Sequence, residues 1–204
     1  MNKFSYGILY GGAAIPSQNE LTARLGEGAD LNSEPILRTV CRIAENMEIK
    51  YAAARVNILR GSDWVDLGFG RIESKALIKN LSDAREAFVF AVTLGVGVDR
   101  LIAREGARSA HSAFIFDSVA SAMAEAACNV AEKVLRIEDE QIAIGADVQV
   151  CPRFSPGYAD FSLSHQPALL DFLDAGRKIG LYIGESLLMT PKKSITAVMG
   201  IKNL

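Results

Sequence analysis

The sequence predicts an α+β protein in which antiparallel strands and grouped helices share one core. Along residues 49–59, small or apolar side chains occupy every second position, as in a strand with one apolar face. A Gly61-Ser62-Asp63 turn then leads into residues 64–69, which is typical of a hairpin. The helical segments are grouped along the chain instead of alternating singly with strands. This order favours an α+β fold over a doubly wound parallel sheet.

The composition excludes several classes of protein. The chain has 204 residues, of which 50% are apolar and 23% charged, as in a globular protein. A net charge of −2 offers no basic surface for nucleic acid. The longest apolar stretch, residues 87–98, is shorter than the ~20 residues of a membrane helix, and no signal peptide is evident. We expect a cytoplasmic protein without nucleic-acid or membrane partners.

Cysteine and histidine usage points to neither a disulfide framework nor a metal site. The three cysteines lie far apart and form no Cys-x-x-Cys pair. His111 and His165 have no acidic or thiol neighbour at ligand spacing. The sequence therefore predicts no bound metal.

The chain divides into two parts of unequal pattern. Residues 1–32 are weakly patterned and rich in glycine and polar residues, which predicts a poorly packed N-terminal arm with a short helix near Leu21. Residues 33–204 carry regular periodicity and are predicted to form a single domain.

Within that domain, periodicity and capping residues predict the elements in order. Helices are expected at residues 34–47, 75–80, 99–105, 110–135 and 165–174, with Ser33, Ser74 and Ser164 as N-caps. Strands are expected at residues 49–59, 64–69, 87–94, 142–150, 178–183 and 194–201. Residues 184–191 form a connection with helical potential that Pro191 closes.

A glycine-rich turn follows the apolar strand at residues 87–94. Gly95-Val96-Gly97 could expose backbone N–H groups to an anion or could simply be a tight turn before a helix that starts near Asp99. Its spacing matches neither the dinucleotide fingerprint nor a phosphate loop. We predict no nucleotide phosphate site here.

The long helix predicted at residues 110–135 is unusual because its middle is nearly free of bulky side chains. The small residues are Ser118, Ala120, Ser121, Ala122, Ala124, Ala126 and Ala127. They allow another backbone or a ligand to come close. Glu125 stands alone among them and is expected to be either solvated or paired with a cation, since a buried unpaired carboxylate is costly.

One short segment combines groups suited to binding a small zwitterion. It reads Arg153-Phe154-Ser155-Pro156-Gly157-Tyr158. Turn chemistry requires only the Pro-Gly pair. Arginine adds a planar fork of donors that matches a carboxylate, and glycine lets a ligand approach the backbone. From these residues alone, the segment is either a ligand cradle or an ordinary surface turn.

Two motifs of the C-terminal third resemble the activation (reactivation) domain of cobalamin-dependent methionine synthase, and more closely its stand-alone activation proteins. They read Arg153-x-x-x-Gly157-Tyr158 and Glu185-Ser186-x-x-Met189-x-Pro191-x-x-Ser194-Ile195. The family pattern is Arg-x-x-x-Gly-Tyr followed by Glu-Ser-x-x-Met-x-Pro-x-x-Ser-Val. The segment at residues 93–102 and the Ala124-Glu125-Ala126 helix are also similar, so that the resemblance spans about residues 33–201.

The resemblance implies a bent, twisted antiparallel sheet with flanking helices that binds S-adenosylmethionine in a shallow groove. It implies an accessory role in methionine biosynthesis, the reductive methylation of cob(II)alamin on a methionine synthase that lacks its own activation domain. The electron would come from a flavodoxin- or ferredoxin-type donor. Cobalamin would stay on the partner, so no catalytic residue is expected in this chain, and its own standing as an enzyme is left open.

The site residues that the resemblance implies lie in the same motifs. Arg153 would clamp the carboxylate of S-adenosylmethionine, and the backbone of Phe154, Ser155, Pro156 and Gly157 would hold its adenine or amino-acid tail. Tyr158 would pack against the ligand or form a groove wall. Glu125 would face the ligand's ammonium or another polar group. Glu185 and Ser186 would brace the neighbouring loop.

Two departures from the family pattern predict a more open or weaker site, which the partner would complete. In methionine synthase, an Asp near the start of the domain and a Tyr near its end also touch the ligand. The arm here has no matching Asp, and the Tyr would fall after Leu204. Two other functions also fit the sequence: a reactivator of a different corrinoid methyltransferase, or a non-catalytic S-adenosylmethionine-binding scaffold or sensor.

Overall fold

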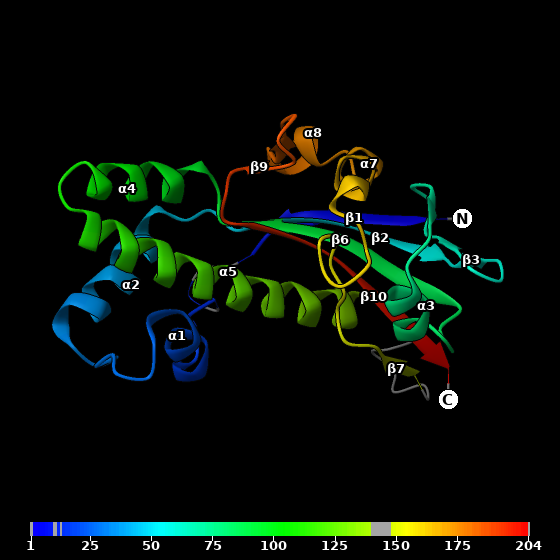
Figure 1. The fold of residues 1–204 in the computed structure, drawn as a ribbon, viewed down its shortest axis with the longest axis horizontal. Coiled ribbons are helices and arrows are strands. Elements are labelled where there is room, and N and C mark those ends of the chain that lie inside the picture. The colour runs from blue at the N-terminus through cyan, green and yellow to red at the C-terminus, as the bar shows by residue number, and fades with distance from the viewer. Residues whose placement is uncertain (1, 10–11, 13, 140–147, 204) are drawn as a thin grey trace.

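A five-stranded antiparallel sheet forms the centre of the molecule, which confirms the predicted α+β class (Figure 1). The structure is a computed structural model and describes residues 2–9, 12, 14–139 and 148–203. The strands lie in the order β1-β2-β6-β10-β7. Their bounds are Lys3–Ile8 (β1), Lys50–Asn57 (β2), Glu86–Thr93 (β6), Val148–Val150 (β7) and Ser194–Asn203 (β10).

The two faces of the sheet follow from the alternation of side chains along each strand. In β2, Ala53 points to one core, whereas Ala52 and Ala54 point to the other. The central strand β6 is buried on both faces, which explains its unbroken run of apolar residues.

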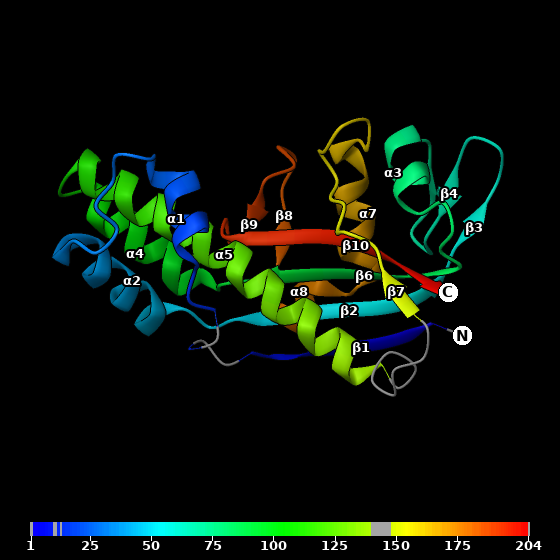
Figure 2. The same cartoon turned by 90° about the horizontal axis from the view of Figure 1, so that it is seen from below.

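One face of the sheet carries α5 (Ala110–Glu138), and three further helices pack against α5 near the end of the sheet. These three are α1 (Gln18–Leu25), α2 (Glu34–Asn46) and α4 (Val96–Gly106). Figure 2 shows α5 running along the sheet with the other three gathered around its N-terminal half. The small residues in the middle of α5, such as Ala120 and Ala127, are fully buried, because they let the helix approach the sheet closely.

By length and composition, α5 is the one helix in the described ranges that could cross a membrane. This property was not predicted from the sequence. However, 56% of its apolar window is buried inside the protein. We therefore interpret α5 as the main core helix of this face.

The opposite face carries shorter elements. They are α3 (Lys75–Asn80), a 3-10 helix (Leu163–His165), α7 (Gln166–Phe172) and α8 (Ala175–Ile179), a small sheet of β3 (Leu59–Arg60), β4 (Val65–Asp66) and β5 (Arg71–Ile72), and a hairpin of β8 (Tyr182–Ile183) and β9 (Met189–Thr190). Phe161 is fully buried in the core on this side, with Leu169 and Leu170 of α7.

Three local predictions on this opposite face were wrong. The strand expected at residues 178–183 begins as the end of α8, and only Tyr182–Ile183 is extended. Residues 184–191 form the turn and second strand of the β8–β9 hairpin instead of a helix. The helical segment before α7 is capped by Ser162, whose side chain accepts from the Ser164 N–H, and not by Ser164. Of the strand predicted at 142–150, residues 142–147 lie outside the described part.

The expectation of a poorly packed N-terminal arm was also wrong. Residues 3–8 form β1, which pairs with β2 in register Lys3↔Arg55 to Ile8↔Lys50. The predicted helix near Leu21 is α1, and Leu21 is buried in the core under α5. The placement of a domain boundary at residue 33 stays a prediction.

The glycine-rich turn after β6 has a packing role. Gly95 has φ +83°, and a Cβ on Gly97 would lie 2.2 Å from the Asn46 carbonyl oxygen. This close approach lets the start of α4 pack against the end of α2, and it accounts for both glycines.

Candidate ligand-binding site

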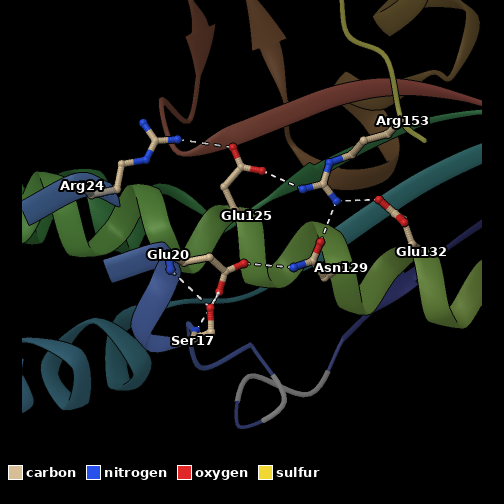
Figure 3. Close-up of polar contacts among 7 residues, drawn as sticks. All are labelled: Ser17, Glu20, Arg24, Glu125, Asn129, Glu132 and Arg153. Carbon is tan, nitrogen blue, oxygen red and sulfur yellow. Dashed lines mark hydrogen bonds and ion pairs between the residues drawn. The ribbon is translucent and has the colours of Figure 1, made fainter. Parts of the chain in front are cut away.

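Arg153 enters the site from the edge of the sheet. After β7, the chain continues beside β10, where the Cys151 N–H donates to the Gly200 carbonyl at 2.8 Å. Phe154 then forms an isolated antiparallel bridge with Val198. Between these two anchors, the Arg153 side chain reaches α5 (Figure 3).

Three side chains on successive turns of α5 surround the Arg153 guanidinium. Its Nη2 donates to Glu125 Oε2 at 2.9 Å, and its Nη1 donates to Asn129 Oδ1 at 2.7 Å and to Glu132 Oε1 at 2.5 Å. Positions 125, 129 and 132 lie on one face of a helix, since they are four and three residues apart. Arg153 and Glu125, which the sequence analysis proposed for one site, are therefore neighbours.

Helix α1 contributes two further charged residues that the sequence analysis missed. Asn129 Nδ2 donates to Glu20 Oε1 at 3.0 Å, and Arg24 Nη2 donates to Glu125 Oε1 at 3.4 Å. The start of α1 is fixed by a capping box between Ser17 and Glu20. This Ser-x-x-Glu pattern is visible in the sequence and would have located the helix, but not its contact with residues more than 100 positions away.

Burial and charge together set the ionisation of this site. The Arg153 side chain is 27% exposed. Burial alone would lower the pKa of Arg153. The surrounding negative groups outweigh this effect and hold that pKa above its ordinary value; they include Glu132 and Glu125. Cys128 lies beneath on the buried side of α5, where burial raises its pKa to about 12. Its thiol stays protonated at neutral pH and is not a nucleophile.

The rest of the predicted segment turns away from Arg153 towards the opposite core. Phe154 packs against that core, with its ring 6.3 Å from Phe161 in a stacked arrangement. Pro156 is buried. Tyr158 meets Phe154 edge-on at 5.4 Å but is 67% exposed, so that most of its ring is free to contact another molecule.

Gly157 is required by the turn itself. Its φ is +89°, a value that favours glycine, and a Cβ there would lie 3.2 Å from Leu163 Cδ1. Its N–H donates to the Phe161 carbonyl at 2.7 Å and is not directed at a ligand. The role of Gly157 in ligand binding stays a prediction.

Glu185 and Ser186 lie apart from Arg153. They are exposed in the β8–β9 turn, which stands on the face of the sheet opposite α5 (Figure 1). Within the described chain, no hydrogen bond or ion pair joins either side chain to residues 153–158. Their bracing role stays a prediction.

The arrangement is suited to binding a zwitterion, because the Arg153 guanidinium lies beside two carboxylates against one face of α5. No cluster of three or more metal-ligating side chains occurs among residues 2–9, 12, 14–139 and 148–203. The fold and this face together define an α+β domain that carries a charged candidate site.

Comparison with known families identifies the class further. The family described as "Vitamin B12 dependent methionine synthase, activation domain" matches residues 77–203. Because the match covers more than half of the chain, the protein belongs to this family. The matched region contains both Glu125 and Arg153.

Solved structures support the fold. The crystal structure of the MetH reactivation domain bound to AdoHcy aligns with 97% of this chain and 78% of its own, with a TM-score of 0.72. The two sequences are 14% identical, so that this likeness concerns the fold alone. A search of curated proteins gave no match.

Proposed function

We propose that this protein is an S-adenosylmethionine-binding accessory subunit for the reductive methylation of cob(II)alamin on a cobalamin-dependent methionine synthase. The observation that carries the proposal is the 2.9 Å contact between Arg153 and Glu125 inside the family-matched region. The two groups have the charges needed to bind the carboxylate and the ammonium of one amino acid.

Binding would exchange partners within the site. Both terminal nitrogens of Arg153 already contact carboxylates, so that a ligand carboxylate bound across both nitrogens would replace one of them. Glu125 is the one to exchange, because its contact is longer than that of Glu132 and its side chain is more exposed (34% against 18%). The displaced Glu125 is then free to accept from the ligand's ammonium.

The other proposed contacts lie away from this pair, on the side of the opposite core. The backbone from Phe154 to Gly157 would hold the adenine or the amino-acid tail, and the exposed ring of Tyr158 would form a wall of the groove. Glu185 and Ser186 would support the loop from the other face.

In this function the chain positions a reactant and needs no nucleophile or general base of its own. Cobalamin bound to the partner would supply the nucleophile that accepts the methyl group, after reduction by a flavodoxin- or ferredoxin-type donor. The partner would be a cytoplasmic methionine synthase lacking its own activation domain. The contribution of this chain would be to position the sulfonium methyl for transfer to the partner's cobalamin.

Calorimetry with S-adenosylmethionine tests the binding step. Arg153→Ala should weaken binding by about 1.5–3 kcal/mol, the usual contribution of a charged hydrogen bond. Arg153→Lys keeps the charge without the planar fork and should bind with intermediate affinity. Arg71→Ala removes an exposed arginine from β5, far along the opposite face, and serves as the control. Absence of binding by the unaltered protein, alone and with its partner, would contradict the proposal.

Spectroscopy on the partner tests the reactivation step. With a low-potential reductant and S-adenosylmethionine, this protein should convert the partner's cob(II)alamin to the methylated form. Conversion only on a different corrinoid protein would favour the alternative reactivator. Binding without any conversion would favour the sensor.

A further inference from the structure

Four charged residues form a row of alternating sign across α1, α5 and the edge of the sheet (Figure 3). The charged row runs Arg24, Glu125, Arg153, Glu132. Its contacts shorten from the α1 end inwards, from 3.4 Å through 2.9 Å to 2.5 Å. The outermost contact is also the most exposed, since 46% of the Arg24 side chain is open to solvent.

The two oxygens of Glu125 are consequently held unequally. Oε2 contacts the half-buried guanidinium of Arg153, whereas Oε1 has only the longer contact with Arg24. Exposed ion pairs between long side chains stabilise a protein little, because water screens them and both side chains lose freedom. A second cation can therefore compete for Oε1.

We propose that Arg24 is a displaceable cation that occupies the ligand's place on Glu125, and that it lowers the affinity of the site for S-adenosylmethionine. This inference rests on the proposed function, in which the ligand's ammonium binds Glu125. The ammonium and Arg24 compete for the same carboxylate. While Arg24 holds Oε1, part of the negative charge of Glu125 is already neutralised, so that the ligand's ammonium binds this carboxylate more weakly.

Displacement of Arg24 does not require α1 to leave the protein. Leu21 is buried under α5, and Glu20 separately accepts from Asn129 at 3.0 Å. The capping box of α1 involves only Ser17 and Glu20. Only the Arg24 side chain has to rotate into solvent, so that Arg24→Gln should fold normally.

Calorimetry on Arg24→Gln tests the competition. We expect S-adenosylmethionine to bind roughly two- to fivefold more tightly than to the unaltered protein, which corresponds to the loss of one exposed ion pair. In a Glu125→Gln background, the same substitution should bring no gain, because the shared carboxylate is gone. 5′-Methylthioadenosine, which lacks the ammonium, should bind both proteins equally.

Arg136→Gln is the matched control for a general change in charge. Arg136 lies on α5 with a similar exposure of 40%, and it contacts Glu132 at 4.0 Å instead of Glu125. An equal gain in Arg136→Gln, or an equal gain for 5′-methylthioadenosine, would overturn the proposal, as would unchanged or weaker binding by Arg24→Gln. If the unaltered protein binds no S-adenosylmethionine, the proposed function itself fails; if it binds and only the Arg24 effect is missing, the function stands without this inference.

Discussion

The segment 153–158 has two unequal parts, Arg153 and residues 154–158, which lie on opposite sides of the sheet edge and make opposite kinds of contact. Arg153 faces α5 and is held by side-chain charges. Phe154 to Tyr158 face the other core and are held by backbone bonds, ring packing and a glycine turn. Side-chain charges can exchange partners with a ligand, whereas a backbone bridge and a packed ring cannot do so without unfolding. Arg153 is therefore suited to exchanging partners with a ligand, and residues 154–158 fix the position of Arg153.

The largest effect is expected at Phe161, which is fully buried behind residues 154–158. A substitution there tests whether these residues serve stability and Arg153 serves binding. Phe161→Ala should reduce the free energy of unfolding by about 3–5 kcal/mol, because it removes a ring from a packed core. Urea denaturation measures this loss. Below the denaturation midpoint, the affinity of Phe161→Ala for S-adenosylmethionine should change far less than that of Arg153→Ala. A comparable loss of affinity in both variants would mean that the two parts of the segment do not have separate roles.

A smaller effect is expected at Gly157, where the two interpretations of the segment differ. Gly157→Ala places a side chain at φ +89° and should reduce stability by about 1–2 kcal/mol. If the glycine serves only the turn, affinity measured on the folded variant will be close to that of the unaltered protein. A loss of affinity larger than that of Phe161→Ala would show that the ligand meets the backbone at Gly157.

The smallest effect is expected at Asp160, which follows residues 154–158 and binds the N-terminus of α3. Its carboxylate accepts from the Ser74 hydroxyl at 2.5 Å and from the N–H groups of Lys75 and Ala76. The Ser74 hydroxyl and the backbone donors hold the pKa of Asp160 below its ordinary value of 3.8. A depressed pKa means that this carboxylate stabilises the fold fully above pH 3.8 and loses its contribution as the pH falls through the folded pKa.

Thermal unfolding as a function of pH checks this assignment. Asp160→Asn should lower the melting temperature at neutral pH and should flatten the acid limb of the stability profile below pH 3.8. The affinity for S-adenosylmethionine at neutral pH should not change. An unchanged acid limb would mean that Asp160 is not held by these donors in solution.

The elements with long, uniform patterns could be predicted from the sequence. β6, α5 and β10 were located nearly to the residue, because burial on both faces or along a wide stripe imposes a continuous apolar pattern. The helix α3 was predicted from the Ser74 cap, whose side chain does accept from the Leu77 N–H. Short elements carry too few residues for a period, which is why α8 and the β8–β9 hairpin were assigned wrongly.

Two members of the candidate site were predictable, but their contact with each other was not. The Arg153 motif and the lone Glu125 were recognisable as residue types, yet nothing in the spacing showed that they contact each other. The role of α1 was less accessible still, since Arg24 and Glu125 are separated by 101 positions. Such contacts depend on how the helices stack over the sheet, and no local pattern encodes that stacking.

The central position of β6 has a consequence for handling the protein. The family match begins at residue 77, after β1, β2 and the helices α1 and α2. A fragment trimmed to the matched residues would leave β6 without its β2 neighbour, so that a strand with seven of eight residues buried would become an exposed edge. A bare apolar edge invites intermolecular strand pairing and precipitation. The strand β2, which precedes the family-matched residues 77–203, therefore protects β6 from intermolecular pairing.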